Sequence, residues 1–360
     1  VNTCSISFGD PKFNESRYAQ QIADQYATNH FVVVVDSDDY GLIDTLARHY
    51  DEPFADSSAI PTYRVCELAS RHVSVALSGD GGDENFAGYR RYRWHAYEQQ
   101  VRSRLPQSIR GPMFGMLGRL YPKLDWAPKF LRAKTTFQAL AKDSLEGFLD
   151  SVSVVSGANR QLLFSRSFKT DLAGYNAVDV LRRHAANCDA ADSLSLVQYL
   201  DIKTYLPGDI LTKVDRASMA HSLEVRVPIL DHTFTEWVAT LPSNWKLRGR
   251  EGKQLLKQSL EAHLPRDVLY RDKMGFAVPI EDWFRGPLKN QIRALADSPV
   301  LAETGIFDTD NIATMIRHHQ SGLRDHSPTI WALVMFEASL RNMGLSSDCV
   351  AEQPPMVANA

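Results

Sequence analysis

The chain has 360 residues, of which 44% are hydrophobic and 23% are charged, and its formal net charge at pH 7 is -3. This length allows about two domains, and this composition is typical of a globular protein that buries its own core. The small net charge argues against a strongly basic nucleic-acid-binding domain, and no apolar run approaches the roughly 18 residues of a membrane span. We therefore expect a cytoplasmic protein whose partners include neither a nucleic acid nor a membrane.

The N-terminal part alternates strand-like and helix-like segments. Short runs rich in valine and other apolar residues are separated by amphipathic patterns with helical spacing. The predicted elements are strands at 4–8, 31–35 and 73–77 and helices at 14–27, 40–50 and from Pro61 onward. This order predicts an α/β fold with a buried parallel sheet and flanking helices.

Downstream of Tyr92 the sequence is arginine-rich and helix-forming, and several prolines interrupt it. A long stretch without strand patterns predicts a large helical insertion, and a further helical part follows it. The last residues, AEQPPMVANA, have the composition of a flexible tail. The predicted organisation is an α/β core over 1–98, a helical insertion over 99–190, a helical C-terminal part over 191–345 and a tail over 346–360.

The segment VALSGDGGDE, residues 75–84, runs from a predicted strand into a loop rich in glycines and carboxylates. Ligands of open α/β sheets bind at this carboxyl edge of the strands. The glycines let backbone N–H groups approach a ligand, and a carboxylate such as Asp83 could hold Mg²⁺ for a polyphosphate. The loop lacks the GK[ST] ending of a Walker A motif. A glycine-rich turn with solvated acids is the alternative interpretation.

Several segments of the chain resemble one family. LSGDGGDENFAGYRRY, residues 77–92, resembles the signature of the synthetase domain of glutamine-hydrolysing asparagine synthetases, which are pyrophosphate-loop ATP hydrolases. Similar segments follow at 206–231, 252–265 and 270–288. The resemblance implies an adenine-nucleotide α-hydrolase-like fold. In that fold, 1–98 is the remaining part of an ATP-binding core, and 191–345 completes the synthetase site.

The resemblance implies an enzyme with two activities. An N-terminal-nucleophile glutaminase domain releases ammonia, and a synthetase domain uses ATP and Mg²⁺ to adenylate a carboxylate, most often that of aspartate. Ammonia then displaces AMP to give the amide. The family's phosphate loop, SGGxDS, closes a strand just upstream of the position of CSISF, and neither this loop nor the glutaminase's leading cysteine occurs in this sequence. We expect a truncated chain that is inactive alone, because that loop's backbone donors hold the pyrophosphate.

The resemblance assigns nucleotide-binding roles to residues of two strands and their loops. Ser78 and Gly79 correspond to positions that touch the nucleotide. Asp83 corresponds to a ligand of magnesium pyrophosphate, and Glu84 is the acid beside it. Ile6, on the first strand, corresponds to a position whose backbone reads the adenine. We therefore expect ATP and Mg²⁺ as cofactors.

Asp80, Asp209 and Lys273 correspond to catalytic positions. Asp80 lines the site and could take a proton from the attacking nitrogen, a contribution worth roughly 10²- to 10⁴-fold in rate. Asp209 corresponds to a carboxylate that partners Asp80, and two acids in one site push their proton affinities apart. A helix N-cap is the alternative for Asp209. Lys273 corresponds to the lysine that stabilises charge on the α-phosphate and the leaving group, and a solvated lysine is its alternative. Lys253, which precedes an amphipathic helix, is interpreted as structural.

Asp56, Ser57 and Arg226 are the candidate substrate-binding residues. Asparagine-forming relatives often carry threonine and arginine where this chain has Asp56 and Ser57, and an acid there would repel a second substrate carboxylate. Asp56 therefore argues against aspartate itself. The resemblance implies aspartate or a related carboxylate as the substrate, and an amide on a sugar or peptide precursor is the alternative product. Arg226, Glu224 and Lys213 also match the family. An ion-pair network that shapes the pocket wall is the alternative for these residues.

Other functions are left open. A relative could join another amine or close a lactam, and an upstream glutaminase cysteine would argue against it. An RNA-modifying pyrophosphate-loop enzyme is suggested by the basic and aromatic segment YRRYRWH, residues 89–95. A non-catalytic remnant would have no need of Asp80, Asp83 and Lys273. The oligomeric state stays open, with a homodimer among the candidates.

Overall fold

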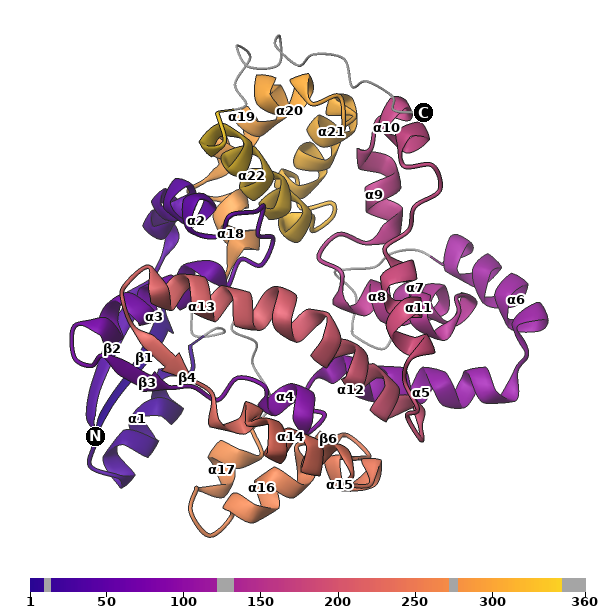
Figure 1. The fold of residues 1–360 in the computed structure, drawn as a ribbon. Coiled ribbons are helices and arrows are strands. Elements are labelled where there is room, and N and C mark those ends of the chain that lie inside the picture. Colours follow the sequence, from indigo (N-terminus) through magenta and orange to yellow (C-terminus); the bar gives the residue numbers. More distant parts are fainter. Residues whose placement is uncertain (10–13, 122–132, 272–277, 345–360) are drawn as a thin grey trace, which may run out of the picture.

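The chain begins with a β-α-β unit (Figure 1). The computed structural model describes residues 1–9, 14–121, 133–271 and 278–344. Strands β1 (Asn2–Phe8) and β2 (Asn29–Val35) pair in parallel along their whole length, and helix α1 (Ser16–Gln25) connects them. At the start of α1, the Ser16 backbone N–H donates to Asn14 Oδ1 over 2.9 Å. These elements confirm the predicted parallel α/β arrangement.

Helices connect β2 to the next strand, β3 (Val75–Leu77). They are the 3-10 helix η1 (Ser37–Leu42), α2 (Ile43–His49) and α3 (Ala59–Ser70). The helix predicted over 40–50 begins earlier, because the Asp36 side chain caps η1 by accepting the N–H of Asp38. Helix α3 begins at Ala59 rather than at Pro61, and its first turn tolerates the proline because N–H groups there have no helical partner.

The parallel strands of the described residues form two separate pairs, β1 with β2 and β3 with β4 (Glu224–Arg226). The prediction of full burial is wrong for one face of β2. Val32 and Val34 are 44% and 60% exposed, whereas Val35 is 1% exposed. Successive side chains of a strand point to opposite faces, so a run of valines does not by itself show that both faces are covered.

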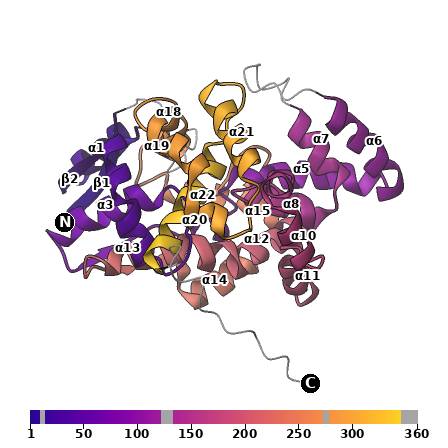
Figure 2. The same cartoon turned by 90° about the horizontal axis from the view of Figure 1, so that it is seen from above.

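The region after β3 is helical. Its helices are α4 (Gly82–Asn85), α5 (Arg90–Arg104), α6 (Gln107–Leu120), α7 (Lys134–Ala141), α8 (Ser144–Val152), α9 (Gly157–Leu163), α10 (Arg166–Asp171) and α11 (Val178–Ala186). Helices α6 and α7 lie at the opposite end of the molecule from β1 and β2 (Figure 2). The described part of the predicted insertion is thus helical. The predicted boundary after residue 98 falls inside α5.

The C-terminal part is also mainly helical. Its helices are α12 (Ser193–Lys203), the π-helix η3 (Leu206–Leu211), α13 (Thr212–Met219), η4 (Pro228–Leu230), α14 (His232–Ala239), α15 (Ser243–Lys246), α16 (Gln254–Leu260), α17 (Arg266–Leu269), α18 (Ile280–Arg285), α19 (Lys289–Ala294), η5 (Leu295–Asp297), α20 (Pro299–Glu303), α21 (Thr309–Gln320) and α22 (Ser327–Asn342). Short strands β5 (Leu247–Arg248) and β6 (Glu251–Gly252) form an antiparallel pair. Within the described ranges, no helix is long and apolar enough to cross a membrane.

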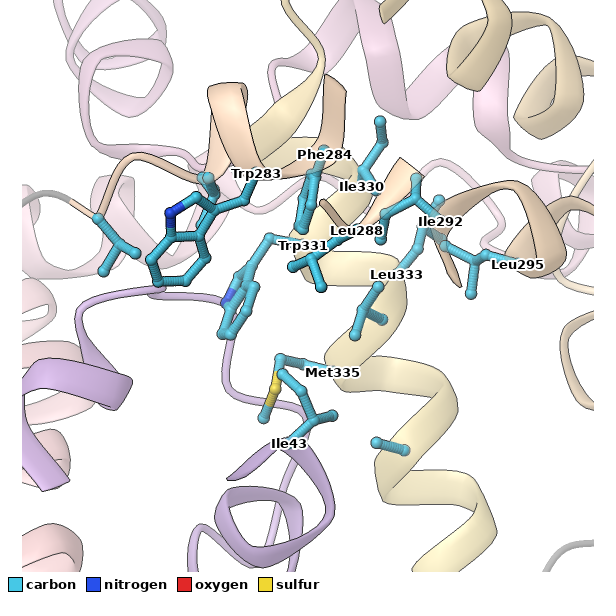
Figure 3. Packing of buried hydrophobic residues seen from close by; sticks show 14 of the residues in the cluster. Ile43, Trp283, Phe284, Leu288, Ile292, Leu295, Ile330, Trp331, Leu333 and Met335 are labelled. Carbon is cyan, nitrogen blue, oxygen red and sulfur yellow. The ribbon is translucent and has the colours of Figure 1, made fainter. Parts of the chain in front are cut away.

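A large hydrophobic cluster joins the two ends of the chain (Figure 3). Trp331 of α22 and Phe284 of α18 are both 0% exposed. Ile43 of α2 and Met335 of α22 belong to the same cluster. Full burial of large apolar side chains contributes roughly 1.5–3 kcal/mol each. Helix α22 therefore fastens the C-terminal helices to the α/β part of the chain.

Candidate active site

The loop after β3 is held by its own hydroxyl and by β4. The Ser78 N–H donates to the Arg226 carbonyl over 2.9 Å, which extends the β3–β4 pairing by one bond. Ser78 Oγ donates to the Asp80 carboxylate and accepts the Asp80 N–H over 3.2 Å. Around Gly79, the space that a side chain would fill is open. The loop therefore presents accessible backbone beside an oriented carboxylate.

Gly81 makes the turn from this loop into α4. Its φ of +79° is left-handed, and the side chain of Leu230 occupies the position that a Cβ would need. Only glycine adopts this conformation at little cost. The turn brings Asp83 into the first turn of α4, where its Oδ1 lies 3.2 Å from Lys253 Nζ.

The sequence favours a structural role for Lys253, and the structure places this residue at the carboxylate loop. It precedes α16 with a left-handed φ of +57°, and its N–H donates to the Phe86 carbonyl over 2.8 Å. Besides the family-like segment 252–265, the neighbouring Gly252 is a local signal in the sequence, since glycine often marks a close approach of two backbones. The loop acid Asp83 thus has a cation beside it.

Glu84 supports the loop from the inside. It is 1% exposed, and Tyr89 Oη donates to its Oε1 over 2.7 Å. Burial raises the pKa of Glu84. Gln198 of α12 donates to the Glu84 carbonyl over 2.6 Å, which ties α4 to α12. The predicted contact of Glu84 with the nucleotide stays a prediction.

Arg91 connects the carboxylate loop to a second acidic group, which contains Asp56 and Asp209. Its guanidinium lies 3.7 Å from the ring centre of Tyr89 and 4.4 Å from that of Tyr205. It also forms an ion pair with Asp201 over 2.7 Å, and Asp201 is 0% exposed. Arg91 belongs to the basic segment that suggests RNA binding, but its guanidinium forms an ion pair with Asp201 inside the protein.

Asp56, Asp209 and Lys213 form the second acidic group. Lys213 Nζ lies 2.6 Å from Asp56 Oδ2 and 3.9 Å from Asp209 Oδ1, and its side chain is 8% exposed. Asp56 also accepts the Ser58 N–H over 2.9 Å and the Ser58 hydroxyl over 2.5 Å. The positive charge of Lys213 offsets the negative charge of Asp56. That negative charge is the basis of the repulsion expected between Asp56 and a second substrate carboxylate. The predicted ion-pair alternative thus describes Lys213.

Asp209 is an unusual carboxyl. It lies inside the π-helix η3, and the N-cap of α13 is Leu211, so the alternative of an N-cap role for Asp209 is wrong. Single π-turns are rare and often occur at functional sites. Burial, followed by the nearby charge of Asp56, raises the pKa of Asp209 to about 7, although Lys213 and a hydrogen bond from Tyr205 oppose the rise.

The pKa of the Asp56 carboxyl is shifted in the opposite direction. Burial alone would raise its pKa, but the Lys213 ammonium and the hydrogen bonds from Lys213 and Ser58 outweigh burial and lower it. Asp56 is therefore the fixed anion of the pair at neutral pH. The acid that acts on Asp209 most strongly in this structure is Asp56, whereas the sequence predicted a pairing with Asp80.

The remaining predicted residues lie on other elements, and their roles stay predictions. The Ser57 carbonyl accepts the Ile60 N–H over 3.3 Å at the start of α3. Ile6 lies on β1 opposite Val33. The Arg226 side chain is 63% exposed and donates to Glu224 over 2.7 Å. Lys273 lies outside the described residues.

Comparisons with known proteins identify the family of the chain. The family model described as asparagine synthase matches residues 1–341. Asparagine synthetase [glutamine-hydrolyzing] 1 of Bacillus subtilis is 28% identical over 93% of this chain and 51% of its own length. A Mycobacterium bovis protein provisionally named asparagine synthetase [glutamine-hydrolyzing] is 31% identical over 93% of this chain and 49% of its own length. The chain spans about half the length of the curated relatives it matches. It belongs to the asparagine synthase family.

Proposed function

We propose that this chain is the synthetase part of an ATP-dependent, glutamine-hydrolysing amidotransferase. A carboxylate, that of aspartate or a related substrate, is adenylated with release of pyrophosphate, and ammonia from glutamine displaces AMP to give an amide. The family match and the printed names of the relatives support the proposal. The observation that carries it is the open glycine loop at the carboxyl end of β3, which bears Asp80 and Asp83.

The donor chemistry of the loop fits ATP with Mg²⁺. Mg²⁺ in such sites is held by one or two carboxylates and completed by phosphate oxygens and water. In the part of the chain that the structure describes, no group of three or more His, Cys, Asp or Glu side chains could hold a metal. Asp83 would hold the ion, and the Lys253 ammonium beside it would face the same phosphates. The nucleotide would supply the adenylyl group that activates the carboxylate, with pyrophosphate as the leaving group.

The acids of the chain supply proton transfer. Ammonia that attacks the activated carbonyl must lose a proton, and a base is most effective when its pKa lies near the operating pH. Asp209, with a pKa raised to about 7, meets this condition. Asp80 is oriented by the Ser78 hydroxyl at the open face of the loop. We assign proton transfer to these two carboxyls and charge stabilisation to Lys273.

We also propose that a segment outside this sequence completes the site. The sequence contains no SGGxDS phosphate loop. Among the described residues, β1 pairs only with β2 and β3 only with β4, so each pair has an edge at which another parallel strand could bind. A phosphate-loop strand between β1 and β3 would join the two pairs into one sheet. The glutaminase that releases ammonia would lie in the same outside segment.

Product analysis of the complete natural protein tests this function. The protein is incubated with ATP, Mg²⁺, glutamine and aspartate, and the products are identified by mass spectrometry. We expect AMP, pyrophosphate and an amide in equal amounts. Asp83→Asn should reduce the rate about 10²-fold or more, because a preorganised charge is lost, while the exposed Asp171→Asn leaves it unchanged. Formation of ADP instead of AMP, or equal rates for both variants, contradicts the proposal.

A further inference from the structure

Asp56 and Asp209 share one lysine but receive very different numbers of hydrogen bonds. Asp56 accepts from Lys213 Nζ and from the backbone N–H and hydroxyl of Ser58, at 2.6, 2.9 and 2.5 Å. Asp209 receives one hydrogen bond, from Tyr205, and its buried Oδ1, 3.9 Å from Lys213 Nζ, has no donor. An ionised carboxylate needs such donors when it is taken out of water.

We propose that Lys213 is a positioning residue that holds Asp56 as a fixed anion and leaves Asp209 as the carboxyl that exchanges a proton with the substrate. When two neighbouring carboxyls cannot both be ionised, the proton resides on the one with fewer donors. The geometry makes that carboxyl Asp209. The inference rests on the proposed function, because the proton is the one that the attacking nitrogen loses.

The position of Lys213 is fixed from two sides. Its Nζ also lies 2.7 Å from Ser58 Oγ, so its ammonium bridges the start of α3 and α13. Tyr50 Oη donates to the Lys213 carbonyl over 3.2 Å, and the Tyr50 ring stacks on Phe54 with centroids 4.4 Å apart. These contacts hold the Lys213 ammonium at Asp56 and Ser58 rather than at Asp209.

The other titratable groups near Asp56 and Asp209 do not change which of the two carboxyls is the fixed anion and which exchanges a proton. Tyr205 donates a hydrogen bond to Asp209 and lowers its pKa, and burial keeps the phenols of Tyr205 and Tyr50 protonated by raising their pKa values. The groups that face the pair or these phenols are Asp56 from the loop before α3, Lys213 from α13, Tyr50 after α2, Cys66 from α3, Tyr205 before η3, Glu84 from α4 and Arg91 from α5.

Carbon-13 NMR of the aspartate carboxyls in this chain measures directly at which pH Asp56 and Asp209 each lose their proton. Asp209→Asn and Asp56→Asn assign the two signals. We expect Asp209 to titrate near pH 7 and Asp56 to stay ionised between about pH 5 and about pH 9. Lys213→Met should raise the Asp209 midpoint by about one unit or more, and Asp56→Asn should lower it by a similar amount. The control Lys203→Met, an exposed lysine of α12, should leave it unchanged.

A rise of the Asp209 midpoint in Lys213→Met and a fall in Asp56→Asn exclude a general loss of structure as the cause of the two shifts. If Lys213→Met does not fold, the fall in the Asp56→Asn variant decides the question. Titration of Asp56 rather than Asp209 near neutral pH, or a rise of the Asp209 midpoint in Asp56→Asn, overturns the proposal.

The complete enzyme gives an independent reading of the same proton. Because ionised Asp209 acts as the base, the acid limb of the rate profile should move to lower pH in Asp56→Asn and to higher pH in Lys213→Met. An acid limb that stays in place in both variants overturns the role in proton exchange. If the complete enzyme forms no amide, the proposed function fails, while the titration in this chain still decides whether Lys213 divides the two acids.

Discussion

Gly252 sets the distance between Lys253 and the carboxylate loop. A Cβ on Gly252 would collide with the backbone carbonyl oxygen of Ala87, so the two backbones approach as closely as glycine permits. This approach lets the Lys253 N–H bond to Phe86 and brings its ammonium to Asp83. The charge pair at the loop therefore depends on a residue that carries no functional group.

Gly252→Ala should lower the free energy of unfolding by about 1–3 kcal/mol, because the overpacked atom meets backbone rather than a side chain that can rotate away. Urea denaturation measures this change. Gly41→Ala is the matched control, since open space surrounds that glycine, and its effect should stay within about 0.5 kcal/mol. Equal stabilities of the two variants would show that the close approach is not required.

The acids of the site could be predicted from the sequence, but not all of their counter-charges. Lys213 follows Asp209 by one helical turn, a spacing that indicates an ion pair. Its closer partner, Asp56, is 157 residues away in sequence, and no local pattern announces that contact. The raised pKa of Asp209 depends on burial and on Asp56, so it could not be predicted from residue types alone.

At the element scale, Arg91 of α5 holds four segments together. The two tyrosine rings that contact Arg91 come from the loop before α5 and from the residue before η3. Its acidic partner, Asp201, comes from α12. Tyr89 then contacts Glu84 of α4, and Tyr205 contacts Asp209 of η3. One guanidinium thus fixes the carboxylate loop relative to the second acidic group.

Arg91→Met should cost about 3–5 kcal/mol in stability, because it leaves Asp201 buried without its counter-charge. Chemical denaturation at pH 7 measures the loss. The neighbouring Arg90 is exposed, so Arg90→Met should change stability by no more than about 0.5 kcal/mol. A similar loss in both variants would contradict a specific role for the buried pair.

Element types were predictable where local chemistry decides them. The β-α-β start follows from periodicity, the helical region after Tyr92 follows from its composition and its lack of strand patterns, and the structure confirms both. The π-helix η3 was not predicted, since a single wide turn has no periodic signature. The exposed face of β2 was also missed, because burial is a property of neighbouring elements.

At the scale of the whole molecule, distant segments build one framework. The cluster around Trp331 joins α22 and α18 to α2 near the start of the chain. Strands β3 and β4 are brought together from the middle of the chain, so the loop after β3 and Arg226 lie side by side. The family resemblance predicted that 191–345 completes the synthetase site, but strand β4 and its pairing with β3 were not predicted. The predicted domain boundaries stay predictions.

We propose that the loop after β3 takes part in activating a carboxylate with ATP. Exchange of labelled pyrophosphate into ATP measures that step directly, without ammonia or glutamine. We predict carboxylate-dependent exchange in the complete natural protein, its loss in Asp83→Asn, and none in this chain alone, which has no SGGxDS loop. Robust exchange by this chain alone, or undiminished exchange in Asp83→Asn, would contradict the account.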